Sequence, residues 1–408
     1  MASFPEVAAV LTVGDELLEG RTRDANLMSI SRALAARGVV VEEARTVADR
    51  LDSISSAVRE LAGEGRLLVT TGGLGPTEDD MTLQGVAQAL GIPLRHDERA
   101  EEMVRSRMSG RRGAFPRSAL KQAVIPRGGI PVLNRVGVAP GVVMESGGGA
   151  VVCLPGVPSE VLGLLEDCLD ALGITGSESK RYALVRTWGV RENDLFDGLT
   201  PRANKLGCRL AYLPGACRVD IKVFGEKRRA MVEWIESRYS RHIYALTPES
   251  LPQALARRLC RLGLSTAVAE SCTGGMLGAE LTSVPGASEW FFGGVISYSN
   301  EAKRDLLDVS EEVLLKEGAV SRQAVAAMAR GAMRRLSADT AMAVSGVAGP
   351  TGGSAEKPVG TVWLAVAGPG GVEEQRVELF GGDREHVRRS SVTCAMGMLL
   401  ELLSEEEG

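Results

Sequence analysis

A turn of small residues follows a short apolar segment in the second half of the chain. Residues 264–268 are typical of a buried strand, the stretch 269–275 carries hydroxyl, thiol and glycine residues, and a helix is predicted to start at Met276. A strand, a small-residue turn and a helix direct a side-chain hydroxyl and backbone N–H groups toward one point, so this turn can hold an anion or an oxyanion. The alternative is that Ser271 or Thr273 only caps the helix.

Tyr298 and Lys303 add the second part of a candidate catalytic site. A serine attacks an amide carbonyl only if another group takes its proton, and with three histidines in the chain a lysine is the available base. That lysine must be neutral, and lowering its pKa from about 10.4 to about 7.5 costs roughly 4 kcal/mol, which implies a dry, enclosed site. Tyr298 stands near the end of a predicted strand and could relay the proton. Cys272 is the rival nucleophile to Ser271, although no histidine lies near it in sequence.

A glycine-rich loop follows a third predicted strand, near residues 340–344. Residues 345–353 contain one serine and four glycines, and such a loop suits an oxyanion or a phosphate. The alternative is a plain surface turn. With the turn after residue 268, this loop predicts a substrate pocket at one edge of a sheet.

The N-terminal part holds a second candidate site, between Thr70 and Thr82. Its glycines let backbone N–H groups approach a phosphate, while nearby carboxylates would repel that phosphate unless a cation lay between them. Mg²⁺, Mn²⁺ or Co²⁺ with oxygen ligands would fit. The alternative is that two of the acids cap a helix. The glycines are Gly72, Gly73 and Gly75, and the predicted metal ligands are Asp15, Glu16, Asp79, Asp80 and Glu160.

The elements that must position these residues alternate between strand and helix. That alternation predicts an α/β fold with parallel sheets covered by helices on both faces, and ligands at the carboxyl ends of the strands. Three domains are expected, at 1–174, 177–247 and 251–408. The middle region is predicted to be a small α+β domain because it carries 14 Lys and Arg against 8 Asp and Glu, and eight of the sixteen aromatic residues.

Bulk composition limits the class of protein. The 408 residues have 44% hydrophobic content and a net charge of −5, so the whole molecule is not a general polyanion binder. The N-terminus has no pattern of a signal peptide, and no apolar run is long enough to span a membrane. The seven cysteines are odd in number and scattered, which favours a reducing, cytoplasmic location over a zinc site or a disulfide framework.

Residues 70–82 resemble the molybdopterin-binding MogA/MoaB domain, and residues 14–20 and 154–160 narrow the resemblance to the CinA family. In that family the domain is linked to metal-dependent cleavage of ADP-ribose to AMP and ribose 5-phosphate. The resemblance implies a divalent metal at this site, with Asp80 as the main acid. The resemblance also assigns four further acids to this site: Asp15, Glu16, Asp24 and Glu160.

The C-terminal region is similar to the CinA C-terminal domain, which resembles the nicotinamide mononucleotide deamidase PncC. The matching stretches are 269–275, 298–303, 345–353, 356–363 and 382–385. The resemblance implies hydrolysis of the carboxamide to the acid and ammonia, with Ser271, Tyr298 and Lys303 as catalytic residues and no cofactor. The implied substrate-binding residues are Thr273, Gly274, Gly275, Ser345, Gly346, Gly349, Gly352, Gly353 and Arg384.

The middle region is KH-like in this family. The GxxG at 173–176 precedes the first predicted strand of that region and is not in a helix–helix turn, so nucleic-acid binding is not expected. The expected partners are small nucleotides and, in a homodimer, a second copy of the chain. The rival hypothesis is a non-enzymatic molybdopterin or nucleic-acid binder, supported by the basic charge of 177–247.

Overall fold

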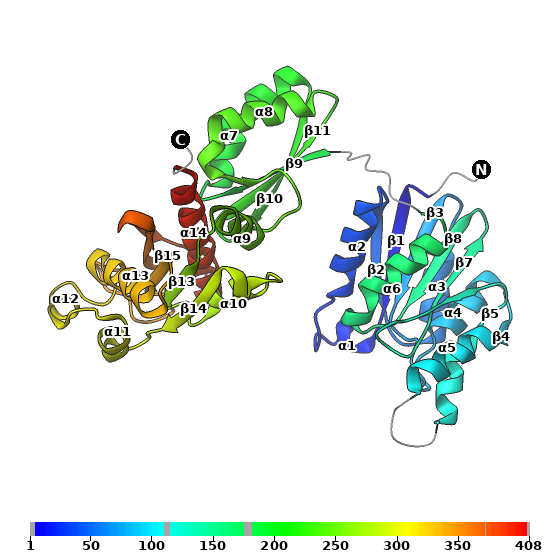
Figure 1. The fold of residues 1–408 in the computed structure, drawn as a ribbon. Helices are drawn as coiled ribbons and strands as arrows, with labels where there is room; N and C mark the ends of the chain where they lie inside the picture. The colour runs from blue at the N-terminus through cyan, green and yellow to red at the C-terminus, as the bar shows by residue number, and fades with distance from the viewer. Residues whose placement is uncertain (1–4, 110–114, 175–181, 372, 406–408) are drawn as a thin grey trace. The chain divides into compact units, whose positions relative to one another are not determined.

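The computed structural model describes residues 5–109, 115–174, 182–371 and 373–405. The chain divides into two compact units, Met1–Lys180 and Arg181–Gly408 (Figure 1). The predicted linker at 175–180, and with it the second half of the GxxG at 173–176, lies outside the described residues.

The first unit is built on a six-stranded sheet in the order β2-β1-β3-β8-β7-β6. Strand β1 (Val7–Val13) pairs in parallel with β2 (Val40–Val47) and β3 (Arg66–Thr71), and β3 pairs in parallel with β8 (Gly149–Leu154). The edge strands β7 (Gly141–Ser146) and β6 (Ile130–Val132) run antiparallel. The predicted parallel arrangement therefore holds for the central strands, whose carboxyl ends carry the polar turns.

Helices cover both faces of this sheet, as Figure 1 shows. Helices α2 (Asn26–Ala36) and α6 (Pro158–Ala171) pack on one face, through side chains such as Ile30 and Leu165. Helices α3 (Leu51–Leu61), α4 (Thr82–Leu90) and α5 (Glu98–Met108) pack on the other. The remaining elements are α1 (Asp15–Leu18), where only a turn was expected, β4 (Leu94–His96), η1 (Arg117–Ala123) and β5 (Val124–Pro126).

The second unit begins with a four-stranded antiparallel sheet in the order β10-β11-β9-β12. Its elements are β9 (Tyr182–Trp188), α7 (Glu192–Leu206), β10 (Arg209–Gly215), β11 (Arg218–Phe224), α8 (Arg228–Tyr239), η2 (Ser240–His242) and β12 (Ile243–Ala245). Helices α7 and α8 cover one face through residues such as Leu199 and Ile235. Trp188 and Tyr244 also come from the small sheet, but they pack in the hydrophobic core of the C-terminal sheet.

The C-terminal sheet has five strands in the order β14-β13-β15-β16-β17. Strand β13 (Thr266–Glu270) lies between β14 (Phe291–Ile296) and β15 (Thr340–Gly346) and is parallel to both. Strands β16 (Thr361–Ala367) and β17 (Glu373–Leu379) add an antiparallel edge, and β17 was missed by the sequence analysis. The short η3 (Ala287–Glu289) and η4 (Pro369–Gly371) precede β14 and β17.

Two helical layers enclose the C-terminal sheet. One layer contains α9 (Leu251–Leu262), α10 (Met276–Thr282) and α14 (Arg384–Glu405), and the other contains α11 (Asn300–Leu307), α12 (Glu311–Lys316) and α13 (Arg322–Leu336). The small side chains of β13 and β15 face the second layer as a row of alanines, among them Ala269 and Ala343, so α13 approaches the sheet closely. Among the described residues, no helix is long and apolar enough to cross a membrane.

Candidate active site

Strands β13, β14 and β15 end side by side, and the predicted catalytic residues follow these ends. The Ser271 N–H donates to the carbonyl of Val344 at 3.0 Å, which holds the turn after β13 against β15. The Ser297 N–H donates to the carbonyl of Glu270 at 2.7 Å, which joins the same turn to β14. The parallel register therefore brings residues distant in sequence to one edge of the sheet.

Lys303 reaches this edge from helix α11. The Ser299 hydroxyl caps α11 by accepting the Ala302 N–H at 3.1 Å, which fixes the first turn that carries the lysine. The Lys303 side chain is only 1% exposed, and its Nζ lies 3.1 Å from Ser271 Oγ. The predicted nucleophile and base are thus in contact, in a buried place.

Burial of the Lys303 amine works against its charged form. Nζ donates to the carbonyl oxygens of Ser297 at 2.8 Å and Tyr298 at 3.3 Å, and a carbonyl oxygen only accepts. A neutral amine has two N–H groups for these carbonyls and keeps its lone pair for the Ser271 hydroxyl proton. An ammonium could donate to all three partners, but burial disfavours the charged form and lowers the pKa of Lys303 below its ordinary 10.5.

Cys272, the rival nucleophile, has the wrong environment for attack. Its side chain is 5% exposed and belongs to the hydrophobic core with Leu277 and Val387. Burial raises the pKa of the Cys272 thiol to about 11, so the thiol stays protonated at neutral pH and is not activated. The geometry therefore favours Ser271.

The Tyr298 side chain does not support the predicted proton relay. It is 63% exposed, and Lys303 contacts its backbone carbonyl instead of its hydroxyl. The hydroxyl accepts a long hydrogen bond of 3.4 Å from Arg384. Tyr298 stands at the open side of the site, where a side chain contacts a substrate more readily than it moves a proton between two buried groups.

Two arginines of α14 border the site. Arg384 donates to the carbonyl of Gly349 at 2.7 Å, and Arg388 donates to the carbonyl of Thr273 at 2.8 Å. Each guanidinium has five N–H donors, so both keep donors for an anion after these contacts. The sequence analysis missed Arg388, although its position four residues after Arg384 on a predicted helix places both on one face.

The glycine loop after β15 differs in part from the prediction. The Ser345 side chain is 1% exposed and donates to the carbonyl of Ala319 at 2.7 Å, so it is a buried structural contact and its predicted binding role is wrong. A side chain at Gly346 would collide with Val362, so this glycine permits close packing of two strands. Gly349 and Gly352 have positive φ angles of 81° and 89°, which the turn requires. Binding by Gly349, Gly352 and Gly353 stays a prediction.

The turn after Ser271 is held by a buried carboxylate that the sequence analysis did not select. Glu270 is 1% exposed, and its two oxygens accept the N–H groups of Gly275 at 2.9 Å, Leu277 at 3.1 Å and Gly278 at 2.8 Å. The Gly274 N–H is also used, since it donates to the Ser271 carbonyl at 3.1 Å. These two glycines therefore shape the turn, and their N–H groups are not free for a substrate as predicted.

Thr273 lies at the centre of the same turn. It is fully buried, and its hydroxyl has no hydrogen-bond partner in the described part of the chain. It does not cap α10, whose start at Gly275 has no side-chain cap. The capping alternative considered for Ser271 and Thr273 is therefore wrong, and the predicted contact of Thr273 with a substrate stays a prediction.

Replacing Glu270 with glutamine should loosen this turn. A glutamine offers one acceptor oxygen in place of two and has no charge at the start of α10, and hydrogen bonds to charged groups are worth about 1.5–3 kcal/mol each. We expect Glu270→Gln to lower the free energy of unfolding by about 2 kcal/mol, measured by urea denaturation. Glu280 of the same helix, which is only partly buried, is the matched control. An equal, small effect of both substitutions would contradict the role given to Glu270.

The glycine turn of the first unit is built around Asp80. The Asp80 carboxylate accepts the Thr77 N–H at 2.9 Å and the Thr77 hydroxyl, and it lies against Gly75. Gly72 and Gly73 have positive φ angles of 101° and 63°. Helix α4 starts after Met81 without a side-chain cap, so the alternative that Asp79 or Asp80 caps this helix is wrong.

Some of the acids predicted to bind a metal lie near Asp49, a residue that was not among them. Asp49 follows β2 and accepts the Asp15 N–H at 2.8 Å. Burial, followed by the charges of Asp15, Glu16 and Asp79, raises the pKa of Asp49. The sequence analysis missed Asp49, which has no glycine motif beside it, although the charges of three predicted acids act on it.

Two further acids serve structural contacts instead. Glu160 accepts the Asn134 side-chain amide at 2.7 Å, and Asp24 accepts the Thr12 hydroxyl and the Leu27 N–H, both at 2.9 Å. In the described ranges, no three His, Cys, Asp or Glu side chains lie close enough together to hold a metal ion. The carboxylates have the right chemistry for Mg²⁺, Mn²⁺ or Co²⁺, but their arrangement does not form a ligand set, so we derive no step through a metal.

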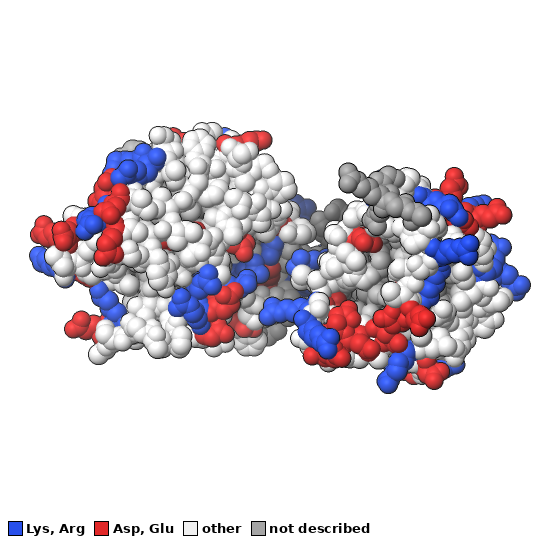
Figure 2. All heavy atoms as spheres, turned by 90° about the horizontal axis from the view of Figure 1, so that it is seen from below, with Lys and Arg blue, Asp and Glu red and all other residues white. Residues whose placement is uncertain are grey.

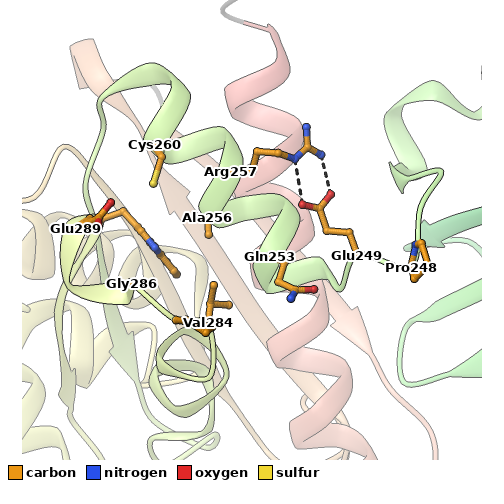
Figure 3. A pocket seen from close by; sticks show the side chains of 11 residues that line it. Pro248, Glu249, Gln253, Ala256, Arg257, Cys260, Val284, Gly286 and Glu289 are labelled. Carbon is orange, nitrogen blue, oxygen red and sulfur yellow. Dashed lines mark hydrogen bonds and ion pairs between the residues drawn. The ribbon is translucent and has the colours of Figure 1, made fainter. Parts of the chain in front are cut away.

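A separate hollow of about 620 Å³ lies beside α9 (Figure 3). Gln253 and Ala256 of the helix line it together with residues 284–286, and Glu249 is paired with Arg257 at its rim at 2.8 Å. None of the predicted site residues line this hollow. The proposed chemistry therefore lies at the strand ends and not in this hollow.

Comparison with known proteins gives a family match for each of two regions of the chain. Residues 248–403 match a family described as the CinA C-terminal domain, and residues 9–173 match a probable molybdopterin binding domain. A CinA-like protein from Anaeromyxobacter dehalogenans is 38% identical over 400 residues, which span 96% of this chain and 98% of that protein. The chain belongs to the CinA family. This result confirms the resemblance inferred from the motifs.

Other similar proteins match either nearly the whole chain or a part of it. A putative competence-damage inducible protein from Halothermothrix orenii is 34% identical over 409 residues, covering 97% of this chain and 98% of that protein. The solved structure of the competence/damage inducible protein CihA from Agrobacterium tumefaciens is 43% identical, covers 39% of this chain and 99% of that chain, and has a TM-score of 0.36. The curated relatives therefore match this chain along nearly its whole length.

Proposed function

We propose that the C-terminal site hydrolyses the carboxamide of nicotinamide mononucleotide to nicotinate mononucleotide and ammonia. The observation that carries the proposal is the 3.1 Å contact between Ser271 Oγ and the buried Lys303 Nζ. A serine beside a neutral amine is a nucleophile with its base, and this pair performs acyl transfer on amides. The family resemblance supplies the substrate.

The reaction would proceed in two halves. Ser271 Oγ attacks the carboxamide carbon while its proton passes to Lys303 Nζ, and the C–N bond breaks as that proton moves to the leaving nitrogen, which departs as ammonia. Water then attacks the ester on Ser271, gives a proton to Lys303 and releases the acid, and the Ser271 hydroxyl regains the proton. The sum is one amide and one water converted to one acid and one ammonia.

The arginines of α14 support a substrate that carries a phosphate. Arg384 and Arg388 both border the turn and loop around Ser271, and guanidinium groups match phosphate oxygens in geometry and charge. A mononucleotide supplies one such phosphate in the same molecule as its carboxamide. The proposed substrate therefore uses both the nucleophile and the positive rim of the site.

We expect the full chain to release ammonia from nicotinamide mononucleotide equally well with and without EDTA. The proposed chemistry needs only the Ser271 hydroxyl and the Lys303 amine, which lie 3.1 Å apart. A coupled assay for ammonia measures the rate, with the Ser271→Ala protein as the control for contaminating amidase. Loss of the rate in EDTA, or an equal rate in the control, would contradict the proposal.

As a second function, we propose hydrolysis of ADP-ribose to AMP and ribose 5-phosphate in the first unit. The observation that favours it is that the charges of Asp15, Glu16 and Asp79 act on the partly buried Asp49, beside a glycine turn suited to a phosphate. A divalent cation between these carboxylates and a phosphate would remove their repulsion. The divalent metal remains part of the proposal, and a ligand set would require Asp15, Glu16 and Asp79 to move.

Asp80→Asn should remove AMP formation from ADP-ribose and leave ammonia release unchanged. The substitution takes away a charge and one of the acceptor oxygens that hold the Thr77 end of the glycine turn. Chromatography of AMP with ADP-ribose and Mn²⁺ measures the first activity, and the ammonia assay on the same sample is the control for folding. Unchanged AMP formation would show that Asp80 only closes the turn.

The rival hypothesis, a nucleic-acid binder, has little support from the surface. Figure 2 shows acidic and basic side chains interspersed on the face drawn. In the middle region, Arg186 is paired with Asp220 at 2.9 Å and Arg191 with Asp194 at 2.8 Å, so part of the positive charge is already neutralised locally. Binding to single-stranded DNA with a steep dependence on salt would favour this rival.

A further inference from the structure

Two cysteines from different sheets of the second unit meet at one point. Cys217 lies in the hairpin turn between β10 and β11, and Cys394 lies in α14, yet their sulfur atoms are 2.8 Å apart. A disulfide bond has an S–S distance of about 2.05 Å, so the pair is reduced but already in contact. Neither cysteine has a part in the chemistry proposed for the sheet edge.

The backbone around Cys217 holds its sulfur in this place. Cys217 has a φ of 52°, in the left-handed region that residues other than glycine rarely adopt, and its carbonyl accepts the Gly189 N–H at 2.9 Å. A strained conformation of this kind persists only where its surroundings enforce it. The turn is thus fastened to the end of β9.

Helix α14, which carries Cys394, is also held firmly in place. Trp188, the last residue of β9, is 1% exposed and packs on α14 at Gly397, where any side chain would collide with the indole ring. Cys394 is also 1% exposed, and Cys217 packs against the same core. The two sulfur atoms therefore face each other across a packed joint between the small sheet and the C-terminal helix.

We propose that Cys217 and Cys394 form a reversible dithiol site that small disulfides such as glutathione disulfide oxidise to a disulfide bond. In a reducing compartment such bonds are usually transient and redox-sensing. The bond would fasten the small sheet to α14 covalently and close a loop across 177 positions of the chain. It goes beyond the proposed hydrolysis and does not depend on it.

The partly exposed Cys217 is the attacking thiol. Its thiolate attacks one sulfur of glutathione disulfide, forms a mixed disulfide and releases one glutathione thiolate. The Cys394 thiol then loses its proton to water and attacks the Cys217 sulfur, which releases the second glutathione. Two protein thiols are oxidised, and one small disulfide is reduced to two thiols. The hydrogen bond from the Cys394 thiol lowers the pKa of Cys217, which suits this order.

The test is oxidation of the reduced full chain with glutathione disulfide, followed by blocking of free thiols and peptide mass spectrometry. We expect one linked peptide pair containing Cys217 and Cys394, with the loss of two hydrogen atoms, and full reversal by dithiothreitol. The exposed Cys260 is the internal comparison, since it has no cysteine partner and should stop at a mixed disulfide with glutathione. Cys260→Ser should leave the linked pair unchanged.

Two results would overturn the proposal. One is that Cys217 and Cys394 both remain open to alkylation in the unfolded protein at glutathione disulfide levels that already modify Cys260. The other is that Cys217 stops at a mixed disulfide with glutathione. A thermal scan gives a second readout: oxidation should raise Tm of the wild-type protein and leave Tm of Cys217→Ser unchanged. Equal Tm values of the oxidised and reduced wild-type protein would contradict a covalent clamp.

Discussion

Ser271→Ala and Lys303→Ala should each lower kcat for ammonia release about 10⁴-fold, and the double variant should be no slower than either single variant. The two side chains act as one unit across the 3.1 Å contact between Oγ and Nζ. Without the hydroxyl there is no nucleophile, and without the amine nothing takes the proton. Steady-state kinetics of all three variants test this result.

Two further substitutions act as controls for the pair. Lys303→Arg should be as slow as Lys303→Ala, because arginine stays charged and accepts no proton. Cys272→Ala should keep most of the activity, since the Cys272 thiol is buried and protonated. Additive losses in the double variant, or Cys272→Ala as the only inactive variant, would overturn the assignment of Ser271 as the nucleophile.

Trp188→Ala should lower the free energy of unfolding of the second unit by about 3–5 kcal/mol. The indole is 1% exposed and fills the joint between β9 and α14 at Gly397, so its removal leaves a large cavity. Arg376 also lies over the ring, 5.7 Å from its centre, and loses this contact. Urea denaturation followed by circular dichroism measures the change.

Trp234→Ala is the matched control for this prediction. Trp234 lies on α8, which covers the same small sheet, and is only partly buried, so the same change of residue type should cost much less. Equal losses for the two tryptophans would show that the cost comes from the small sheet itself. The contact between Trp188 and α14 would then add nothing to the free energy of unfolding beyond what any tryptophan of this region adds.

The contact between Ser271 and Lys303 could be predicted from the sequence because each residue follows a recognisable strand end. Parallel strands bring their carboxyl ends to one edge, so the motif at 269–275 and Lys303 had to lie near each other. The scarcity of histidine then left lysine as the base. Both inferences need only local pattern and topology, and the 3.1 Å contact agrees with them.

Other residues could not be predicted because their roles depend on three-dimensional contacts. Glu270 reads as one more strand residue, and only the fold reveals that it holds three backbone N–H groups. Asp49 and Cys217 likewise stand in stretches without a motif. Each meets partners supplied by a different element, which spacing along the chain does not encode.

The errors have a common physical origin. Ser345 and the N–H groups of Gly274 and Gly275 were assigned to a substrate, but buried polar groups near a strand end first satisfy one another. The Tyr298 hydroxyl was expected at Lys303, but a backbone carbonyl occupies that position. Residue type gave the chemistry of these groups, and packing decided which of them remained available.

The pH dependence of kcat/KM for ammonia release tests most directly whether Lys303 is the neutral base of Ser271. Lys303 must lose its proton before it accepts one, so the rate should rise with pH along the curve of a single deprotonation and then level off. Because burial lowers the pKa of Lys303, the midpoint of this rise should lie below 10.5. A rate that is flat or falls over the same range, or that rises only around 10.5, would contradict a buried neutral lysine as the base.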